Sequence, residues 1–148
     1  MKSNIGKMEK LLKIHYNVFN DWNQLQQFLK RKGNPRYELV GDVKLRYQND
    51  IFDLGNLVRV DGDLYLNYTP IESLGNLVRV EGNLIVHETS IQSLGSLEYV
   101  GAYLDLSYTS IQSLGNLKYV GDGIVVSSDH QIPPEQLTKF KDQIKYYY

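Results

Sequence analysis

The chain has 148 residues, a formal net charge of −1 and no cysteine. This length fits a single domain around one continuous core, and the near-neutral charge gives no general argument for nucleic-acid binding. Disulfides and thiolate chemistry are excluded, which fits a reducing compartment. No apolar run approaches the roughly 18 residues of a membrane-spanning helix, and lysines interrupt the apolar residues near the N-terminus. We therefore expect a cytoplasmic protein.

Charge is distributed unevenly along the chain. Residues 1–38 carry eight Lys and Arg against three Asp and Glu, whereas residues 39–148 carry eight against fourteen. We expect one folded unit with three parts: a basic helical cap (1–38), a repeated segment (39–132), and a C-terminal capping helix with a tail (133–148).

The N-terminal cap is predicted to contain two helices. Asp21 can cap the second helix, with Gln24 three residues later as in a capping box. Lys30–Lys32 fall in its last turn, and Gly33 and Pro35 are helix-stop signals. Both helices would cover the open edge of the repeated segment. The earlier helix is expected to carry Ile5, Met8, Leu11, Leu12 and Phe19.

The middle of the chain repeats with a period of 20 residues. Three segments that begin at Leu57, Leu77 and Leu97 align without a gap, and degenerate copies flank them until Pro133. A fixed period of this size is typical of a solenoid, in which each repeat buries its apolar face against the next. The sequence predicts an α/β repeat solenoid of about five coils.

Each coil is predicted to contain one strand. Apolar residues alternate with variable residues at Leu64, Leu84 and Leu104, and this period of two predicts strands with one buried face. Strands at the same position in every coil would form one parallel β-sheet. The return path is too short for a helix, so extended or irregular segments are expected there: residues 58–60, 78–80 and 98–100.

Two more columns recur in the clean copies. Glycines are predicted to mark a corner where φ is positive: Gly55, Gly75, Gly95 and Gly115. Hydroxyls are predicted to bond the backbone where each strand turns away: Thr69, Thr89 and Thr109.

The motif Leu-x-Leu-x-x-Thr-x-Ile occurs at residues 64–71 and 104–111, and at 84–91 with Val86 in place of the second leucine. It resembles the leucine-rich-repeat consensus L-x-x-L-x-L-x-x-N-x-L. The 20-residue period is similar to that of the short bacterial class. Threonine replaces the family asparagine and the first leucine is absent, so we expect a flatter stack, similar to receptor L-domain solenoids. Residues 28–37 also resemble the N-terminal module of small repeat proteins encoded by bacteria and their phages. Over residues 39–132 the resemblance implies a binding scaffold.

The C-terminal segment is predicted to close the last coil. Pro134 suits the first turn of a helix whose apolar residues would be Leu137, Phe140 and Ile144. Tyr146–Tyr148 follow this helix without a predicted role.

No motif in the sequence indicates catalysis. His15, His87 and His130 fall in different elements, so a shared metal site is not expected. Asp61 and Asp63 flank a glycine without the further ligands of a calcium loop. Phosphate-binding and nucleophile motifs are absent. We expect no enzymatic activity, no metal and no cofactor.

The candidate site lies on the outward face of the predicted sheet. Inward positions are nearly identical between copies, whereas outward positions differ freely, as expected of a recognition surface and also of an unconstrained one. Several are tyrosines, which are enriched at interface anchors; the alternative is cross-strand packing that stiffens the sheet. The predicted protein-binding residues are Lys44, Arg46, Tyr65, Asn67, Tyr68, Ile85, His87, Tyr103, Asp105 and Tyr108.

A secondary basic patch is predicted in the cap, at Lys30, Arg31, Lys32 and Arg36. It suggests an alternative function, nucleic-acid binding with the solenoid as a spacer. The same cations also complement the dipole of the predicted helix, and the acidic solenoid opposes a polyanion. Nucleic acid is therefore not the expected partner.

We expect a non-enzymatic protein-binding module that is monomeric alone and acts on a larger protein as an inhibitor, decoy or adaptor. The family resemblance implies one concrete version, a phage-encoded inhibitor of a host defence nuclease, similar to an anti-CRISPR protein. The identity of the partner does not follow from the sequence.

Overall fold

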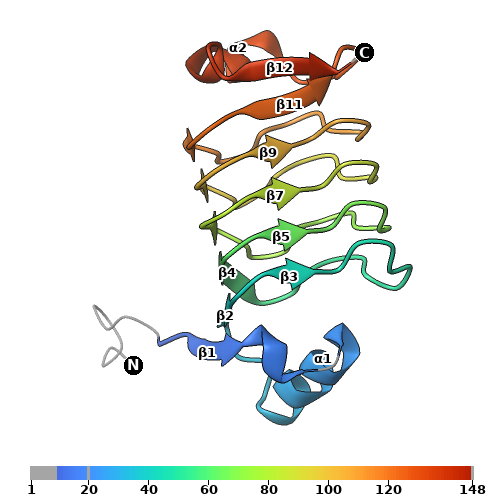
Figure 1. The fold of residues 1–148 in the computed structure, drawn as a ribbon, viewed down its shortest axis with the longest axis vertical. Coiled ribbons are helices and arrows are strands. Elements are labelled where there is room, and N and C mark those ends of the chain that lie inside the picture. Colours follow the sequence, from blue (N-terminus) through green and yellow to red (C-terminus); the bar gives the residue numbers. More distant parts are fainter. Residues whose placement is uncertain (1–9, 20, 148) are drawn as a thin grey trace, which may run out of the picture.

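The structure, a computed structural model, describes residues 10–19 and 21–147. Short strands form two parallel sheets along a nearly straight column of stacked coils (Figure 1). The back sheet is ordered β1 (Leu12–His15), β2 (Tyr37–Val40), β4 (Leu57–Asp61), β6 (Arg79–Val80), β8 (Tyr99–Val100) and β10 (Tyr119–Val120). The front sheet is ordered β3 (Val43–Lys44), β5 (Leu64–Tyr65), β7 (Leu84–Ile85), β9 (Leu104–Asp105), β11 (Ile124–Ser127) and β12 (Ile144–Tyr147).

The prediction of a single sheet is wrong, because the return path, expected to be extended or irregular, forms a strand of its own in a second sheet. The amide of Glu81 donates to the carbonyl of Val60 (2.9 Å), and the amide of Gly101 donates to that of Val80 (2.9 Å). Extended segments stacked in register satisfy one another's backbone groups, and buried backbone requires such partners. In the middle coils these back strands are two residues long, too short to show a period of two in the sequence.

The inward side chains repeat in register through one core, as predicted. Leu64, Leu84 and Leu104 pair in register through successive coils of the front sheet, and the valines of the back sheet do the same. Full burial of each such side chain contributes about 1.5–3 kcal/mol before chain entropy is subtracted. Members of these columns that are fully buried are Leu64, Leu84, Leu104, Val60, Val80 and Val100.

Two corners of the coils have left-handed backbone. The glycine corner has φ between 56° and 61°, which confirms the predicted positive φ, and consists of Gly55, Gly75, Gly95 and Gly115. The tyrosine corner lies three residues after the end of each of the first four front strands. Its φ lies between 54° and 65°, and it consists of Tyr47, Tyr68, Glu88 and Tyr108.

The threonine column binds the backbone beside the tyrosine corner, as predicted. The hydroxyls donate to carbonyl oxygens three residues earlier, at distances of 2.7 to 2.8 Å. Each bond satisfies a carbonyl where the front strand ends. The donors are Thr69, Thr89 and Thr109, and the acceptors are Leu66, Val86 and Leu106.

The first predicted helix of the N-terminal cap is instead a strand. β1 lies parallel to β2 in the back sheet, with Leu12 beside Tyr37. Ile14 is buried between exposed Lys13 and His15, which is the alternation of a strand rather than of a helix face. This strand covers the open edge of the back sheet with backbone hydrogen bonds that a helix cannot supply.

The second predicted helix is present as α1 (Trp22–Arg31), after the 3-10 helix η2 (Tyr16–Val18). The carboxylate of Asp21 accepts a hydrogen bond from the amide of Gln24 at 2.8 Å, as a helix cap should. Ile5 and Met8, which were assigned to the earlier helix, lie outside the described residues.

The C-terminal cap ends in a strand. The predicted helix is limited to α2 (Pro134–Leu137) and the 3-10 helix η3 (Thr138–Phe140), and Phe140 is buried. Ile144 was expected on this helix, but it begins β12 and pairs with Ile124. These two residues are one repeat period apart, so β12 continues the repeat beyond the prolines that interrupt it. Across residues 10–19 and 21–147, no helix has the length and hydropathy needed to cross a membrane.

Candidate functional site

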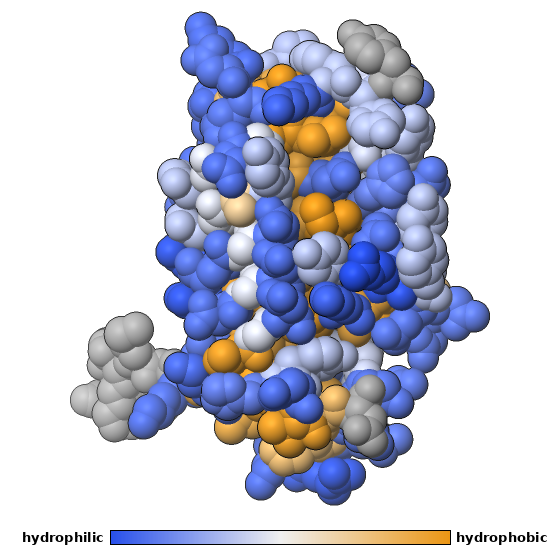
Figure 2. All heavy atoms as spheres, viewed as in Figure 1, coloured by the Kyte–Doolittle hydropathy of each residue, from blue (hydrophilic) through white to orange (hydrophobic). Residues whose placement is uncertain are grey.

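The front sheet presents the predicted central column on one face. Lys44, Tyr65, Ile85 and Asp105 pair in register across four neighbouring strands and alternate with buried residues. Figure 2 views this face and shows hydrophobic patches at the height of β7 and β11 among hydrophilic side chains. The structure therefore brings these predicted residues together on one outward face, where Lys44 is exposed and the other three are half-buried.

Two charged groups hold Tyr65 on this face. Its hydroxyl donates to the carboxylate of Asp63 at 3.0 Å, and the guanidinium of Arg46 lies 4.8 Å from the centre of its ring. Burial, and then the hydrogen bond to Asp63, raise the pKa of the Tyr65 hydroxyl. A ring fixed in this way loses little conformational freedom when a partner binds.

The polar column at the start of the front strands is structural. A side-chain oxygen in one coil accepts a hydrogen bond from an amide in the next: Asp42 from Asp63 (2.8 Å), Asp63 from Asn83 (2.7 Å), and Asn83 from Tyr103 (2.9 Å). These bonds satisfy amides that enter the front strands. Tyr103 ends this series with a side chain 47% exposed, as the prediction of a surface residue requires.

A chain of polar contacts joins three coils on the same face. The hydroxyl of Ser107 donates to the carboxylate of Asp105 (2.6 Å), and Nδ1 of His87 lies 2.7 Å from the Ser107 oxygen. The hydroxyl of Tyr68 lies 3.4 Å from Nε2 of His87. A hydrolytic triad places histidine between serine and aspartate, whereas here a fully buried serine takes the middle position. These contacts orient the imidazole of His87.

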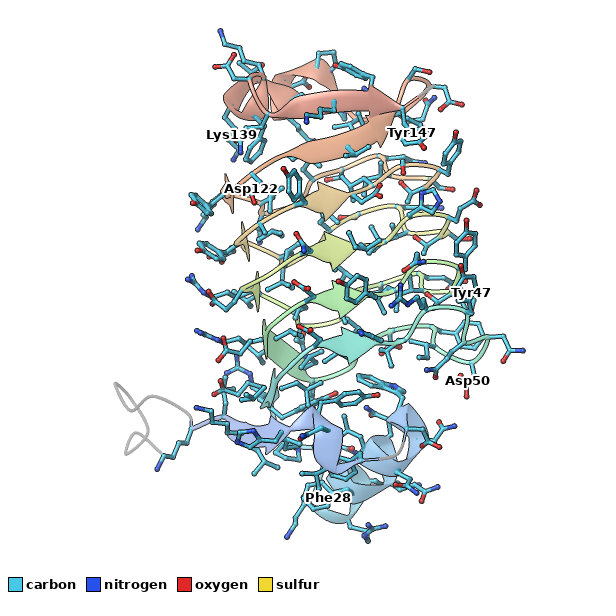
Figure 3. All side chains as sticks on the ribbon, viewed as in Figure 1. Phe28, Tyr47, Asp50, Asp122, Lys139 and Tyr147 are labelled. Atoms are coloured by element: carbon cyan, nitrogen blue, oxygen red, sulfur yellow. The ribbon has the colours of Figure 1, made fainter. Side chains whose placement is uncertain are left out.

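Aromatic rings beside the tyrosine corner form a continuous column, which we call the aromatic ladder: Tyr47, Tyr68, His87, Tyr108 and Tyr147. The first two rings stack with centres 4.9 Å apart and planes 7° apart. The next three contacts are edge-to-face, with centres 5.4 to 5.6 Å apart. Figure 3 shows both ends of the ladder, Tyr47 and Tyr147, on the same edge of the column. All four tyrosines are at least 45% exposed.

Strain and stacking oppose each other in the ladder with similar magnitude. Left-handed backbone costs about 1–2 kcal/mol for a residue with a Cβ atom. An aromatic pair contributes about 0.5–1.5 kcal/mol beyond its buried area. Tyrosine therefore offers folding little advantage over asparagine or glycine at this corner. Because strained backbone clusters at functional sites, the ladder is a candidate site.

The predicted site contained only part of this ladder. Tyr68, His87 and Tyr108 were included and Asn67 lies half-buried beside them, whereas the two end rings, Tyr47 and Tyr147, were not among the predicted binding residues. Tyr47 lies three residues after the end of the first front strand, as Tyr68 does in the next coil. Tyr147 pairs with Ser127, one period earlier, so the 20-residue period was the signal that could have found it.

A second ladder covers the back sheet, where no strand was predicted. Arg59, Arg79, Tyr99 and Tyr119 pair in register. The guanidinium of Arg79 lies 3.6 Å from the centre of the Tyr99 ring, and the two tyrosine rings stack with centres 4.7 Å apart. Both arginines form ion pairs with Glu81. The repeat of arginine at the 20-residue period was the sequence signal for this surface.

The basic patch lies on the N-terminal cap, away from the front face. Lys30, Arg31 and Lys32 are exposed at the end of α1, and Arg36 precedes β2. The ammonium of Lys32 lies 5.6 Å from the centre of the Phe28 ring. Figure 3 shows Phe28 at the cap end of the column, beyond the first front strand. The structure does not place this patch among the outward residues of the front sheet.

Hollows occur at both caps of the column. One of about 220 Å³ lies between α1 and the first coil, and others of about 290 and 390 Å³ adjoin α2. Among the described residues, no three His, Asp or Glu side chains converge as metal ligands would. The hollows therefore lack the converging charged groups around which a metal site is built.

No family model matches the sequence, and no curated protein and no solved structure matches it. The repeat solenoid is established by the two parallel sheets themselves. The resemblance to leucine-rich repeats gains no further support from these comparisons.

Proposed function

We propose that the chain is a non-enzymatic protein-binding module whose front-sheet face contacts a larger protein. The observation that carries this proposal is the contrast between the two sides of the front strands. Inward residues repeat almost unchanged and are fully buried, whereas the outward column changes from Lys44 to Tyr65, Ile85 and Asp105. A repeated scaffold that keeps its core and varies one exposed face is suited to recognition.

The exposed aromatics on and beside this face support the same function. Tyr103 and Tyr108 are about half exposed, and Tyr65 is held by Asp63 and Arg46. Tyrosine in such positions is enriched among residues that dominate binding energy. Strands spaced about 4.8 Å apart give the face a length of roughly 25 Å, so a stable contact would extend onto an edge of the column.

A finer version follows from the sequence resemblance alone. The chain would be a short leucine-rich-repeat solenoid of bacterial or phage origin that acts on a target protein in the cytoplasm as an inhibitor, decoy or adaptor. An inhibitor of a host defence nuclease is one concrete form of this proposal. Identification of the captured partner tests it.

The experiment compares capture by a front-face variant and a back-sheet variant. Three tagged proteins are exposed to extracts of cells that produce the protein. They are the wild type, the front triple variant Tyr65→Ala, Ile85→Ala, Tyr103→Ala, and the control variant Lys118→Ala, Tyr119→Ala. A captured partner is then purified and its affinity for each variant is measured by calorimetry. We expect binding to fall at least 10-fold for the front variant and about twofold or less for the control. Equal loss in both variants would refute the front face as the site.

Nucleic-acid binding through Lys30, Arg31, Lys32 and Arg36 is the alternative. These cations are exposed, but residues 39–148 carry eight basic against fourteen acidic residues. Gel shifts with single- and double-stranded DNA and RNA should show at most weak complexes that disappear as salt rises. A sequence-specific complex at nanomolar concentration would make the alternative the better assignment.

A further inference from the structure

The aromatic ladder has a shape that suits one class of occupant. It runs along the column through four ring-to-ring contacts with centres 4.9 to 5.6 Å apart, about 20 Å in all, and passes the coil of β11 between Tyr108 and Tyr147. An extended polypeptide advances about 3.3 Å per residue, so roughly six residues would cover its length. A linear segment therefore matches the ladder better than a compact ligand does.

The arrangement of the rings argues against ligands that need free ring faces. Tyr47 and Tyr68 stack face to face, and the later rings meet edge to face. Sugars and nucleic-acid bases bind by stacking on a free aromatic face. Within the ladder, Tyr47 and Tyr68 cover one face of each other's ring, and each ring between the two ends has a neighbour on both sides, which restricts stacking by a sugar or a base.

The charges beside the ladder are mainly negative. Three exposed carboxylates lie at it: Glu88 at the tyrosine corner, Asp129 two residues after Ser127, which pairs with Tyr147, and Asp50, which accepts a hydrogen bond from the side-chain amide of Asn23 at 3.2 Å. In the described part of the chain none of the three forms an ion pair. Figure 3 shows Asp50 on the same edge as Tyr47. Two cations are close in sequence: Arg46, whose guanidinium lies over Tyr65 on the front face, and exposed Lys145, two residues before Tyr147 in β12. The ladder edge is therefore complementary to a cationic partner.

We propose that the aromatic ladder binds an extended, Arg- or Lys-rich segment of a partner protein along the edge of the solenoid. Carboxylates of the edge would pair with the cations of the segment, and tyrosine hydroxyls would accept hydrogen bonds from its side chains and backbone. Arginine would also contact the exposed outer face of Tyr47, whose side chain is 70% exposed. This inference rests on the proposed function and adds the chemistry of the partner.

The test measures binding of fluorescent peptides by anisotropy. One probe alternates arginine and serine over about eight residues, and the other alternates glutamate and serine over the same length. The ladder variant is Tyr68→Asn with Tyr108→Asn, because asparagine tolerates left-handed backbone. The matched control is Tyr99→Ser with Tyr119→Ser, which removes a stacked pair from the back sheet. Oligothymidine and a cello-oligosaccharide serve as competing ligand classes.

We expect the wild-type protein to bind the arginine peptide at least 10-fold more tightly than the glutamate peptide. The ladder variant should lose at least 10-fold in affinity, and the control about twofold or less. The variant Glu88→Gln with Asp129→Asn changes only exposed carboxylates, and its affinity for the arginine peptide should fall severalfold. This second variant decides the outcome if thermal denaturation shows that the ladder variant is unfolded.

Equal affinity for both peptides, or equal loss in the ladder and control variants, would overturn the inference. Tighter binding of the nucleotide or sugar probe would overturn it as well. The peptides do not require the natural partner, and the front-face variant Tyr65→Ala, Ile85→Ala, Tyr103→Ala leaves the ladder intact. If the front-face variant loses its partner but the arginine peptide does not bind the ladder, only the basic segment is refuted. If the arginine peptide binds the ladder but the front-face variant keeps its partner, only the front face is refuted.

Discussion

The glycine corner and the tyrosine corner share one backbone conformation but differ in what lies beside them. At the glycine corner, a Cβ atom on Gly75 would lie 2.6 Å from the carbonyl oxygen of Gly55, and the amide of Asn76 donates to that same oxygen. Coils touch there through the backbone, so glycine is required by packing as well as by φ. At the tyrosine corner, Tyr68 and Tyr108 project outward and remain 45% exposed.

This difference separates a residue that the fold requires from one that it merely tolerates. Glycine at the first corner avoids conformational strain in each coil, and at Gly75 and Gly115 it avoids a clash as well. Tyrosine at the second corner accepts the strain and gains stacking of similar size. The second corner is therefore where a function other than folding can determine the residue.

The largest effect on stability is expected from Gly75→Ala. Left-handed φ costs about 1–2 kcal/mol for alanine, and crowding against Gly55 adds about 1–3 kcal/mol. Urea denaturation should show a loss of about 2–5 kcal/mol in the free energy of unfolding. A loss below about 1 kcal/mol would mean that the coils do not pack closely at this corner.

Gly95→Ala separates strain from crowding at the same corner. Gly95 has φ of 56°, but a Cβ atom there would meet nothing within 4 Å. Only the conformational term remains, so we expect a loss of about 1–2 kcal/mol in the same denaturation experiment. If Gly95→Ala were as costly as Gly75→Ala, the close approach would have no energetic weight.

Buried Tyr37 provides a contrast to the exposed tyrosines of the ladder. Burial raises the pKa of its hydroxyl to about 12 from an ordinary value of 10.0. The neutral form is thus favoured in the folded state. The stability that this pKa shift contributes is complete below pH 10 and disappears as pH rises towards 12. Between pH 8 and 11 this ionisation should remove about 1 kcal/mol of stability. The Tyr37→Phe variant has no hydroxyl to ionise at this position, so its stability should fall less over this pH range. An equal fall in the wild type and the variant would contradict the raised pKa of Tyr37.

The smallest effect on folding is expected from Tyr68→Asn. The variant loses stacking against Tyr47 and the contact with His87, but it relieves left-handed strain. These terms nearly cancel, so the free energy of unfolding should change by less than about 1 kcal/mol. A loss as large as that of Gly75→Ala would identify the ladder as a structural element.

The core and the glycine corner could be predicted because the repeat displays them three times. Leu64, Leu84 and Leu104 recur at one period, and only glycine adopts positive φ cheaply. The back strands were missed because two residues cannot show a period of two. β1 was missed because Leu11 and Leu12 also fit a helical face, and β12 because Pro133 and Pro134 interrupt the visible repeat.

The aromatic ladder was partly hidden for a different reason. Tyr68 and Tyr108 occupy the same position in their coils, but Glu88 takes that position in the third coil and His87 continues the ladder one residue earlier. A column that changes both residue type and position between coils has no fixed period. The side-chain contacts therefore became visible only in three dimensions.

The most direct test of the central claim is a nuclear magnetic resonance titration of the isotope-labelled protein with the arginine–serine peptide. Binding along the ladder predicts that the largest amide shifts occur at Tyr68, Glu88 and Tyr108, with the core unchanged. The stacked pair Tyr99 and Tyr119 on the back sheet should barely respond. Shifts concentrated on that pair or on the end of α1, or no shifts at a saturating peptide concentration, would contradict the assignment of the tyrosine corner to binding.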